Sequence, residues 1–402
     1  MITQKTKKLG ELCKFVRGPF GGSLKKSCFK EDGFAVYEQQ HAIYNQFNKV
    51  RYFVDEVKFE EMKRFELKSG DLIMSCSGTM GKVAIVPEGI KKGIINQALL
   101  KLTPSKNLDV EYLRYWMQSP SFTEELERHT VGAAIKNVAS VKILKTIELP
   151  APPLPQQKQI VAALDKAFAA IDTAKTNAGQ NLQNAKELFE SYLQNVFENK
   201  DEGWEEKRLD EITEVKDGTH DSPKYIPAGI PFVTQKNIKL NGFNIKNTKF
   251  ITEADHNKFY KRSNVSYGDI LISMIGANRG MSAIVDIKEV FSIKNVGLIK
   301  GNENINQFFL LYYLKSTFAM KYVKHMSNGG AQEFIGLRAL RAFPIPFPQS
   351  IEEQKKIVQK LDSLSEETKK LEAIYKQKIS DLEEMKKSVL QKAFSGQLNT
   401  IN

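Results

Sequence analysis

The sequence predicts an α+β protein with a pseudo-two-fold tandem repeat: two globular α+β domains alternate with two long helices that form an antiparallel intramolecular coiled coil. Blocks of the 402-residue chain recur about 200 residues apart in the same order. Each copy begins with β-rich runs and turn residues and ends with apolar residues at helical spacing. We therefore expect globular domains at 1–150 (domain 1) and 204–348 (domain 2), and helical spacers at 151–203 and 349–402.

The repeat is clearest where each helical part begins. The segment "PQQKQIVAALD" at 155–165 returns as "EEQKKIVQKLD" at 352–362, an offset of 197 positions. In the globular parts, "SGDLIMSCSGTMGKVAIV" at 69–86 corresponds to "YGDILISMIGANRGMSAIV" at 267–285. Because several blocks keep the same order and nearly the same offset, we infer a tandem duplication of about 200 residues.

The globular parts combine predicted strands with predicted helices. Runs such as "DLIMSC" and "KVAIV" in copy one, and "DILISMI" and "SAIVDI" in copy two, are typical of strands between turns. Segments 109–126 and 306–323 place aromatic and aliphatic residues at helical spacing, which predicts amphipathic helices with aromatic rings in the core. Each globular part is therefore predicted to be α+β.

Proline clusters mark the exit from each globular part, "LPAPPLPQ" at 149–156 and "FPIPFPQS" at 343–350, because proline interrupts both strands and helices. Apolar residues then follow in steps of three and four. In copy one they are Ile160, Leu164, Phe168, Ile171, Ala178, Leu182, Ala185, Phe189, Tyr192 and Val196; in copy two Ile357, Leu361, Leu364, Thr368, Leu371, Leu382, Met385 and Val389. This spacing predicts two helices, each with one stripe that packs against another helix.

A helix over 156–197 would be about 63 Å long at about 1.5 Å per residue. Its nearest partner is its duplicate in the same chain. We expect the two helices to pair head to tail, with one globular domain at each end of the rod. An intermolecular coiled coil is the alternative.

The charge balance favours an acidic partner. The chain has a formal net charge of +12 and a pI of about 9.2, and nucleic acid is the commonest acidic partner of basic proteins. The three cysteines, Cys13, Cys28 and Cys76, form no CxxC pair, which favours a reducing compartment. Because there is neither a secretory signal pattern nor a run of about 18 apolar residues, we expect a cytoplasmic protein without a membrane span.

Motifs for catalysis are missing. The segment "SGTMGKV" at 77–83 lacks the glycine spacing and the hydroxyl of a Walker loop, and is interpreted as a turn between strands. Glu214 and Lys216, with Asp210 upstream, resemble a nuclease motif only locally, and copy one does not repeat the carboxylate. The five histidines show no metal-ligand spacing. We therefore predict a binding protein with no metal site and no catalytic residues.

The order of domain, proline-rich exit, "EQ..I…LD" pattern and long helix, given twice, resembles the specificity subunit of type I restriction–modification enzymes. The resemblance covers essentially the whole chain, although copy one has Gln156–Gln157 where copy two has Glu353–Gln354. It implies that each globular domain is a target-recognition domain that reads one half of a bipartite double-stranded DNA site. It also implies that the helices set the half-site spacing and dock two methyltransferase subunits.

The same resemblance implies that this chain is not an enzyme and binds no cofactor. The partner methyltransferases would bring S-adenosylmethionine, and partner motor–nuclease subunits would use ATP and magnesium. A stand-alone DNA-binding regulator that dimerises through the coiled coil is the main alternative. A nuclease with degenerate motifs and an adaptor without DNA binding are further alternatives, and the positive charge disfavours the adaptor.

DNA contacts are predicted from chemistry, because the resemblance implies no fixed base-reading residues. Lysine and arginine contact phosphates, whereas arginine, lysine, asparagine and glutamine read base edges. The Gly-rich segments 131–138 and 328–334 are expected to let the backbone approach a phosphate. The predicted DNA-binding residues are Lys25, Lys26, Gln39, Gln40, Lys82, Asn96, Lys136 and Asn137 in copy one, and Lys224, Gln235, Lys236, Asn237, Asn278, Arg279, Lys294 and Asn295 in copy two.

Overall fold

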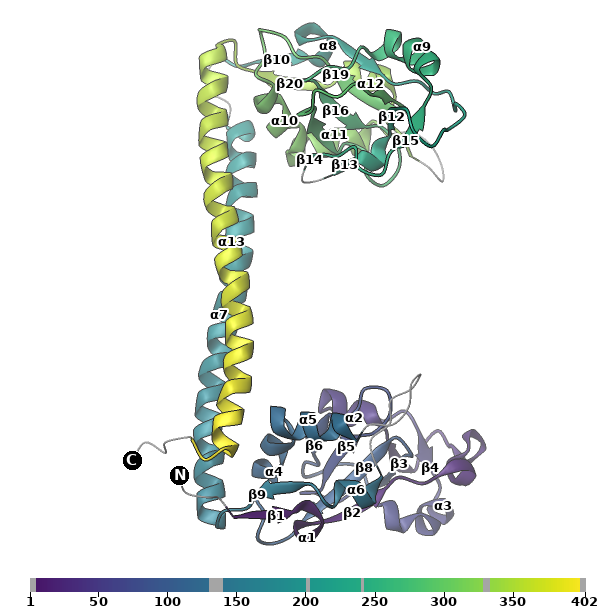
Figure 1. Ribbon diagram of the computed structural model, residues 1–402, viewed down its shortest axis with the longest axis vertical. Helices are drawn as coiled ribbons and strands as arrows, with labels where there is room; N and C mark the ends of the chain where they lie inside the picture. The colour runs from purple at the N-terminus through teal and green to yellow at the C-terminus, as the bar shows by residue number, and fades with distance from the viewer. Residues whose placement is uncertain (1–4, 130–139, 200–202, 240–241, 328–332, 398–402) are drawn as a thin grey trace. The chain divides into compact units, whose positions relative to one another are not determined.

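The computed structural model describes residues 5–129, 140–199, 203–239, 242–327 and 333–397. The chain divides into two compact units. Unit 1 comprises Met1–Gly179 with Gln377–Asn402, and unit 2 comprises Gln180–Lys376. Each unit therefore combines one globular domain with a segment of each of the two long helices (Figure 1).

Domain 1 is built on a four-stranded antiparallel sheet and a smaller mixed sheet. The four-stranded sheet has the order β2 (Cys13–Arg17), β8 (Leu99–Pro104), β5 (Leu72–Ser75) and β6 (Val83–Ile85). The second sheet has the order β4 (Phe53–Val54), β3 (Phe34–Tyr37) and β7 (Gly93–Ile95), in which β3 and β7 run parallel. Strands β1 (Thr6–Lys8) and β9 (Glu148–Pro150) form an antiparallel pair.

Both faces of the four-stranded sheet are covered, which explains why β5 is buried throughout and does not alternate between apolar and polar residues. Leu72 and Met74 point into a cluster that contains the helix residues Leu113 and Phe122, whereas Ile73 belongs to a second cluster with Tyr37. The helices of domain 1 are α1 (Leu9–Leu12), α2 (Gln39–Tyr44), α3 (Glu56–Glu61), α4 (Val110–Met117), α5 (Pro120–Arg128) and α6 (Val141–Leu144), with 3-10 turns η1 (Gly21–Leu24), η2 (Lys26–Cys28) and η3 (Lys63–Phe65).

The predicted amphipathic segment 109–126 forms two helices. Asp109 caps α4 by accepting hydrogen bonds from the backbone amides of Glu111 and Tyr112. Ser119 caps α5, and Pro120 occupies its first turn, where a missing N–H costs nothing. Segment 306–323 breaks in the same way at Ser316, which caps the second helix of that segment.

Domain 2 repeats this topology. Its sheets have the orders β11-β19-β16-β17, β15-β12-β18 and β10-β20, matching those of domain 1, and it adds a short hairpin, β13-β14. The strands are β10 (Glu205–Arg208), β11 (Val215–Asp217), β12 (Ile230–Val233), β13 (Ile238–Lys239), β14 (Gly242–Phe243), β15 (Lys249–Ile251), β16 (Ile270–Ser273), β17 (Ser282–Ile284), β18 (Ser292–Ile293), β19 (Val296–Ile299) and β20 (Pro344–Phe347). The helices are α8 (Leu209–Ile212), α9 (Glu253–Ser263), α10 (Gln307–Lys315), α11 (Thr317–His325) and α12 (Leu337–Arg341), with η4 (Gln235–Asn237).

The repeated Gly–Asp dipeptide forms the turn before the central strand of each four-stranded sheet. Gly70 and Gly268 have positive φ angles of 82° and 86°, which a residue with a side chain rarely adopts. The Asp71 carboxylate accepts a hydrogen bond from the Lys68 amide at 2.9 Å, and Asp269 accepts one from the Ser266 amide at 2.8 Å. The repeat therefore preserves a turn geometry at this place.

The two long helices are α7 (Leu154–Glu198) and α13 (Ile351–Phe394). In unit 1, Ile160, Leu164 and Phe168 of α7 share a core with Leu390 and Phe394 of α13. Figure 1 shows the two helices side by side in this unit. In unit 2, Leu193 and Phe197 share a core with Val358 and Leu361.

The direction of the pairing follows from two ion pairs in unit 1. Lys386 Nζ lies 3.0 Å from Asp172, and Lys175 Nζ lies 2.6 Å from Glu383. As the residue number rises along α7 it falls along α13, so the helices are antiparallel. The predictions of two α+β domains and of an antiparallel intramolecular helix pair are confirmed.

Part of the predicted apolar stripe of α13 is wrong. Leu371 and Met385 are 37% and 51% exposed, so they do not belong to the buried stripe. The predicted Thr368 and Leu382 are buried or partly buried, and between them the partly buried positions are Glu372, Tyr375 and Ile379, so the stripe keeps steps of four and three. Because the inward position 372 holds a glutamate, the apolar pattern points to the neighbouring Leu371, which is exposed.

The repeated "Q…D" pattern attaches each globular domain to its helix. Buried Gln157 accepts a hydrogen bond from the Asp109 amide at 2.8 Å and donates to the Asn107 and Pro152 carbonyls at 3.0 and 2.8 Å. Its duplicate, Gln354, makes the same three contacts in unit 2, to Asn306, Asn304 and Pro348. We call these two glutamines the anchor glutamines.

Two aspartates complete this attachment. The Tyr115 hydroxyl of α4 donates to Asp165 of α7, and the Tyr312 hydroxyl of α10 donates to Asp362 of α13. The recurring sequence at 155–165 and 352–362 thus encodes one joint, used twice. None of the helices that the structure describes combines the length and apolar character needed to cross a membrane.

Candidate nucleic-acid interface

The positive charge of the chain belongs to the globular domains. Domain 1 contains 24 Lys and Arg against 17 Asp and Glu, and domain 2 contains 20 against 14, which gives net charges of +7 and +6. The helical spacers 151–203 and 349–402 carry only −2 and +1. A polyanion is therefore attracted to the two domains and much less to the helices.

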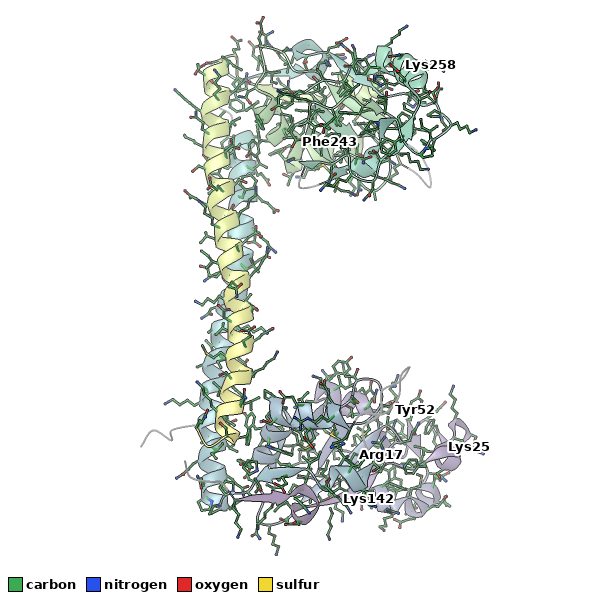
Figure 2. All side chains as sticks on the ribbon, viewed as in Figure 1. Arg17, Lys25, Tyr52, Lys142, Phe243 and Lys258 are labelled. Atoms are coloured by element: carbon green, nitrogen blue, oxygen red, sulfur yellow. The ribbon has the colours of Figure 1, made fainter. Side chains whose placement is uncertain are left out.

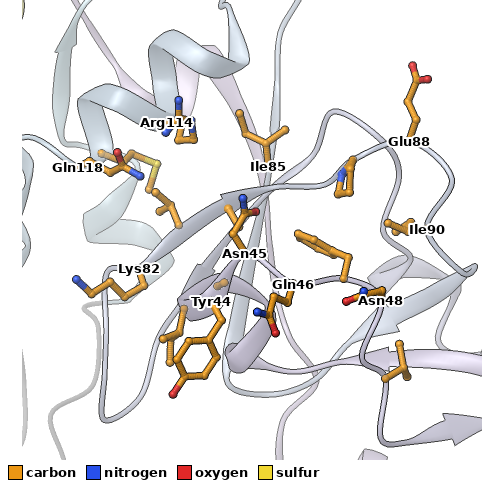
Figure 3. A pocket seen from close by; sticks show the side chains of 18 of the residues that line it. Tyr44, Asn45, Gln46, Asn48, Lys82, Ile85, Glu88, Ile90, Arg114 and Gln118 are labelled. Carbon is orange, nitrogen blue, oxygen red and sulfur yellow. The ribbon is translucent and has the colours of Figure 1, made fainter. Parts of the chain in front are cut away.

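Domain 1 has an open hollow of about 1350 Å³. It is lined by residues 42–48, 50 and 53 at and after α2, by residues 81–85 and 87–91 around β6, and by side chains from α4 and α5, including Arg114 and Gln118 (Figure 3). We refer to this feature as the domain 1 hollow. Figure 3 shows Asn45 between the α4 side chains and the residues Gln46 and Asn48.

Residues 44–48 lie at the rim of this hollow because α2 is short and both of its ends are fixed. His41 is fully buried; its Nδ1 accepts from the Glu38 amide at 2.9 Å, and its Nε2 lies 3.1 Å from the Lys49 carbonyl oxygen. Asn45 ends the helix in the left-handed region, with φ of 52°. The residues that follow are thereby fixed at the rim, with Tyr44, Asn45, Gln46 and Asn48 exposed.

Among the cations of the hollow lining, Lys82 alone has no ion-pair partner in the described part of the chain. Arg114 is bound to Glu111 at 2.6 Å and lies over the Tyr115 ring at 4.0 Å, and Lys91 is bound to Asp32. Lys82 is exposed at the turn before β6. Its charge is therefore available to a phosphate.

The turn that carries Lys82 rests on α5. Gly81 has a φ of 77°, and a Cβ added there would lie 2.8 Å from Leu126 Cδ2. In domain 2 the corresponding turn rests on α11: a Cβ at Gly280 would lie 2.9 Å from Met320 Sδ. Both copies therefore present, beside a helix, a turn that joins a central strand to an edge strand of the four-stranded sheet. In domain 2 the β13–β14 hairpin, which carries Phe243 (labelled in Figure 2), lies against β17, and Phe243 packs on Phe291 with ring centroids 5.2 Å apart.

Arg279, in the corresponding turn of domain 2, is already engaged in the protein. Its Nε donates to Ser327 Oγ at 2.8 Å, its guanidinium pairs with Glu333, and its side chain is 17% exposed. Ser327 and Glu333 flank residues 328–332 in the sequence. The DNA contact of Arg279 stays a prediction. The structure shows that Arg279 also connects Ser327 and Glu333, which lie on either side of residues 328–332 in the sequence.

The other predicted residues of domain 1 lie at several places. Lys25 and Lys26 are exposed at the 3-10 turns η1 and η2, and Lys25 projects from the domain surface (Figure 2). Gln39 and Gln40 begin α2, next to the hollow. Asn96 accepts a hydrogen bond from the Ala98 amide at 3.0 Å within a turn. Lys136 and Asn137, with most of the Gly-rich segments 131–138 and 328–334, lie outside the described residues.

In domain 2, Lys224, Lys236 and Asn278 are exposed, and Gln235 begins η4. Three predicted residues are engaged within the domain. Buried Asn237 accepts from the Thr234 amide and donates to the Asn244 carbonyl, both at 3.0 Å. Lys294 donates to Ser222, and Asn295 lies 2.7 Å from His220 Nδ1.

Sequence reasoning did not select Tyr44, Asn45, Gln46, Asn48 and Gln118. The run "YNQFN" at 44–48 is rich in amides, and that composition was the available signal. Its placement depends on the buried His41 and on the left-handed Asn45, neither of which a linear pattern reveals.

The part of the chain that the structure describes contains no group of three His, Cys, Asp or Glu side chains able to hold a metal ion. Burial raises the pKa of the Cys13 and Cys76 thiols to about 12, so both are protonated at neutral pH. Two copies of one basic α+β domain, each joined to a nearly neutral helix pair, define a class of protein with two nucleic-acid-binding domains.

Comparison with known proteins gives the family. Residues 1–181 and 201–381 each match the model of the type I restriction modification DNA specificity domain, and the chain belongs to this family. The MjaVIII specificity subunit of Methanocaldococcus jannaschii is 27% identical over 333 residues, which cover 78% of this chain and 76% of the relative. The EcoBI specificity subunit of Escherichia coli is 24% identical over 356 residues, covering 82% and 73%.

Solved structures share the fold. One chain, from a study of complex assembly and conformational transition of the type I restriction–modification system, aligns with a TM-score of 0.75 and 18% identity over 98% of both chains. The HsdS subunit from Thermoanaerobacter tengcongensis aligns with a TM-score of 0.68 and 19% identity, over 98% of this chain and 97% of its own. The fold of this chain, with its two tandem copies, is therefore also the fold of these two solved structures.

Proposed function

We propose that this chain is the DNA-recognition subunit of a type I restriction–modification complex and catalyses no reaction itself. Each globular domain reads one half of a bipartite double-stranded DNA site. The observation that carries this proposal is the duplication of one basic domain, with net charges of +7 and +6, on helices that are almost neutral. Family membership of both copies supports the same conclusion.

We further propose that the paired helices dock two methyltransferase subunits. The same joint occurs twice, with the anchor glutamines Gln157 and Gln354 in equivalent contacts, so two identical partners would meet equivalent surfaces. The methyltransferases would bring S-adenosylmethionine and methylate adenine. Motor–nuclease subunits, with ATP and magnesium, would join the complex for restriction. Because the proposed target is DNA, the proposed location is the cytoplasm.

The helices are also proposed to set the distance between the half-sites. Two readers on the same side of B-DNA are separated by about one helical turn, roughly 34 Å. A helix pair is stiff on that length scale, because each helix buries its stripe against the other. The number of unspecified base pairs would then depend on helix length, at about 5.4 Å per turn of helix.

The test is to co-express the chain with a type I methyltransferase subunit from the same genome and to map methylated adenines. We expect methylation at one bipartite motif with a fixed spacer, lost when this chain is omitted. Methylation that is independent of this chain would contradict the proposal. Incubation of the isolated chain with DNA and magnesium is expected to give no cutting.

A further inference from the structure

We propose that the domain 1 hollow is the base-reading surface of domain 1, and that its free amides read adenine in the half-site that this domain recognises. This inference rests on the proposed function and names the residues and the base. Gln46 and Gln118 are the proposed base-reading side chains, Lys82 the phosphate contact, and Tyr44 an apolar contact to a thymine methyl group.

The hollow differs from a small-molecule site in its size and in the polar side chains at its rim. Pockets for small ligands have volumes of about 300–1000 Å³ and mostly apolar walls. The domain 1 hollow has about 1350 Å³, and its rim carries the exposed polar side chains of Asn45, Gln46, Asn48 and Gln118 (Figure 3). An extended polar ligand, such as the edge of a DNA groove, matches this surface.

The amides at the rim are free for a ligand. Within the described residues, the side chains of Asn45, Gln46, Asn48 and Gln118 make no hydrogen bond to protein, in contrast to the buried Gln157, whose amide makes three. An amide presents one acceptor and two donors, which match N6 and N7 of adenine in the major groove.

The available cations favour adenine over guanine. Guanine is most often read by arginine or lysine, and arginine presents the fork that matches its O6 and N7 atoms. Arg114, the arginine of the hollow lining, is bound through Nε to Glu111 and lies over the Tyr115 ring, so its charge is already compensated within the protein. Lys82, which has no such partner, supplies a single positive charge suited to a phosphate. Tyr44, 67% exposed, offers an aromatic face beside these groups.

The experiment uses the full chain assembled with its methyltransferase. Gln46→Ala and Gln118→Ala are compared with wild type for binding to duplexes in which each base pair of each half-site is changed in turn. We expect both variants to lose discrimination at adenine-containing positions of one half-site by about ten- to a hundredfold, and to keep full discrimination in the other half-site. Methylation mapping should show a relaxed first half-site with an unchanged spacer.

Matched controls isolate the two roles. Asn177→Ala removes an exposed amide of α7 outside the globular domains and is expected to leave both half-sites unchanged. Lys82→Ala is expected to weaken binding to all DNA sequences and to lower the slope of log K against log salt concentration by about one unit. Lys14 lies on β2, at the opposite edge of the four-stranded sheet, so Lys14→Ala is expected to change neither the affinity nor this slope.

Three results would be decisive. Wild-type motif and affinity in Gln46→Ala and Gln118→Ala would overturn the inference while leaving the proposed function intact. Loss of methyltransferase assembly in these variants, seen by gel filtration, would identify the hollow as a protein interface and would also overturn it. A wild-type complex without any bipartite motif would refute the proposed function itself.

Discussion

The anchor glutamines show how much a single buried side chain can decide at the residue scale. Gln157 fills the gap between the exit from domain 1 and the start of α7, where three backbone groups would otherwise lack partners. A buried group left without a hydrogen bond costs about 1–3 kcal/mol. The attachment of the domain to its helix therefore depends on this amide more than on any surface charge.

We expect Gln157→Ala to lower the free energy of unfolding by about 2–4 kcal/mol, because it leaves the Asp109 amide and two carbonyls unpaired. Chemical denaturation followed by circular dichroism measures this change. The neighbouring Gln156 is exposed, so Gln156→Ala is the matched control and should change stability by less than about 0.5 kcal/mol. Equal effects of the two substitutions would contradict the anchoring role.

Arg279 distinguishes a DNA contact from an internal bond. Arg279→Ala is expected to weaken DNA binding at low salt, as predicted from the sequence. Because Glu333 neutralises this cation in the protein, Glu333→Ala should strengthen binding modestly. Filter binding over a salt series provides the measurement. Equal weakening by both substitutions would show instead that the ion pair serves only to join the segments around Ser327 and Glu333.

Burial of several weak acids predicts loss of stability at alkaline pH. Burial raises the pKa of Tyr37 and Tyr313 to about 12 from 10.0, and that of Cys13 and Cys76 to about 12 from 9.0. The pKa of each of these groups is higher in the folded protein than in the unfolded chain. Their contribution to the free energy of unfolding is therefore complete below about pH 9 and is lost as the pH rises toward 12.

We expect the free energy of unfolding to fall by at least about 2 kcal/mol between pH 8 and pH 11. Thermal melts across this range measure the change, and absorbance of tyrosinate should rise together with unfolding. A stability that is constant up to pH 11.5 would contradict the burial of these groups.

At the scale of secondary-structure elements, the sequence predicted the long helices and missed details set by packing. The stripe of α7 followed from apolar residues alone. In α13 the inward positions include Glu372, so apolar identity pointed to Leu371, which is exposed. The β13–β14 hairpin was not predicted, since the run around Gly242 has neither length nor alternation, and it forms because it packs on β17.

The candidate site was less predictable than the fold. Lysines such as Lys82 were identified by charge, but the buried role of Asn237 and the exposure of Gln118 depend on tertiary contacts. The hollow joins residues near 45, 82 and 118, and no periodicity links positions so far apart. Chemistry could name suitable residue types, whereas only the fold shows which of them remain free.

Helix length supplies a test at this scale. Four residues inserted near Gly179 in α7, together with four near Lys376 in α13, add about one turn, or roughly 6 Å, to both helices where the two units meet in sequence. We expect a methylated motif with the same half-sites and a longer spacer. An insertion in α7 alone is the control and should destabilise the protein without a new defined spacing. An unchanged spacer in the double insertion would refute the proposal that the helices measure distance.

At the scale of the whole molecule, the chain uses its own duplicate as the partner of each helix. Unit 1 contains both the beginning of α7 and the end of α13, and unit 2 contains the remaining segments of both. The buried stripes of the two long helices are thereby covered within one chain.

We therefore expect the isolated protein to be a monomer at micromolar concentration, and its mass to rise only when methyltransferase is added. Sedimentation velocity measures this directly. A concentration-dependent dimer of the isolated chain would favour the stand-alone regulator that pairs through its helices.

The joint used twice has an evolutionary consequence. Any recognition domain that offers a backbone amide and a phenol at the places of Asp109 and Tyr115 fits either helix, because Gln157 and Asp165 have equivalents in Gln354 and Asp362. Recombination in the DNA that encodes these joints would exchange whole recognition domains between the two positions, or introduce recognition domains from other proteins of the family. New target sequences could then arise in one event, with no redesign of the scaffold that carries them.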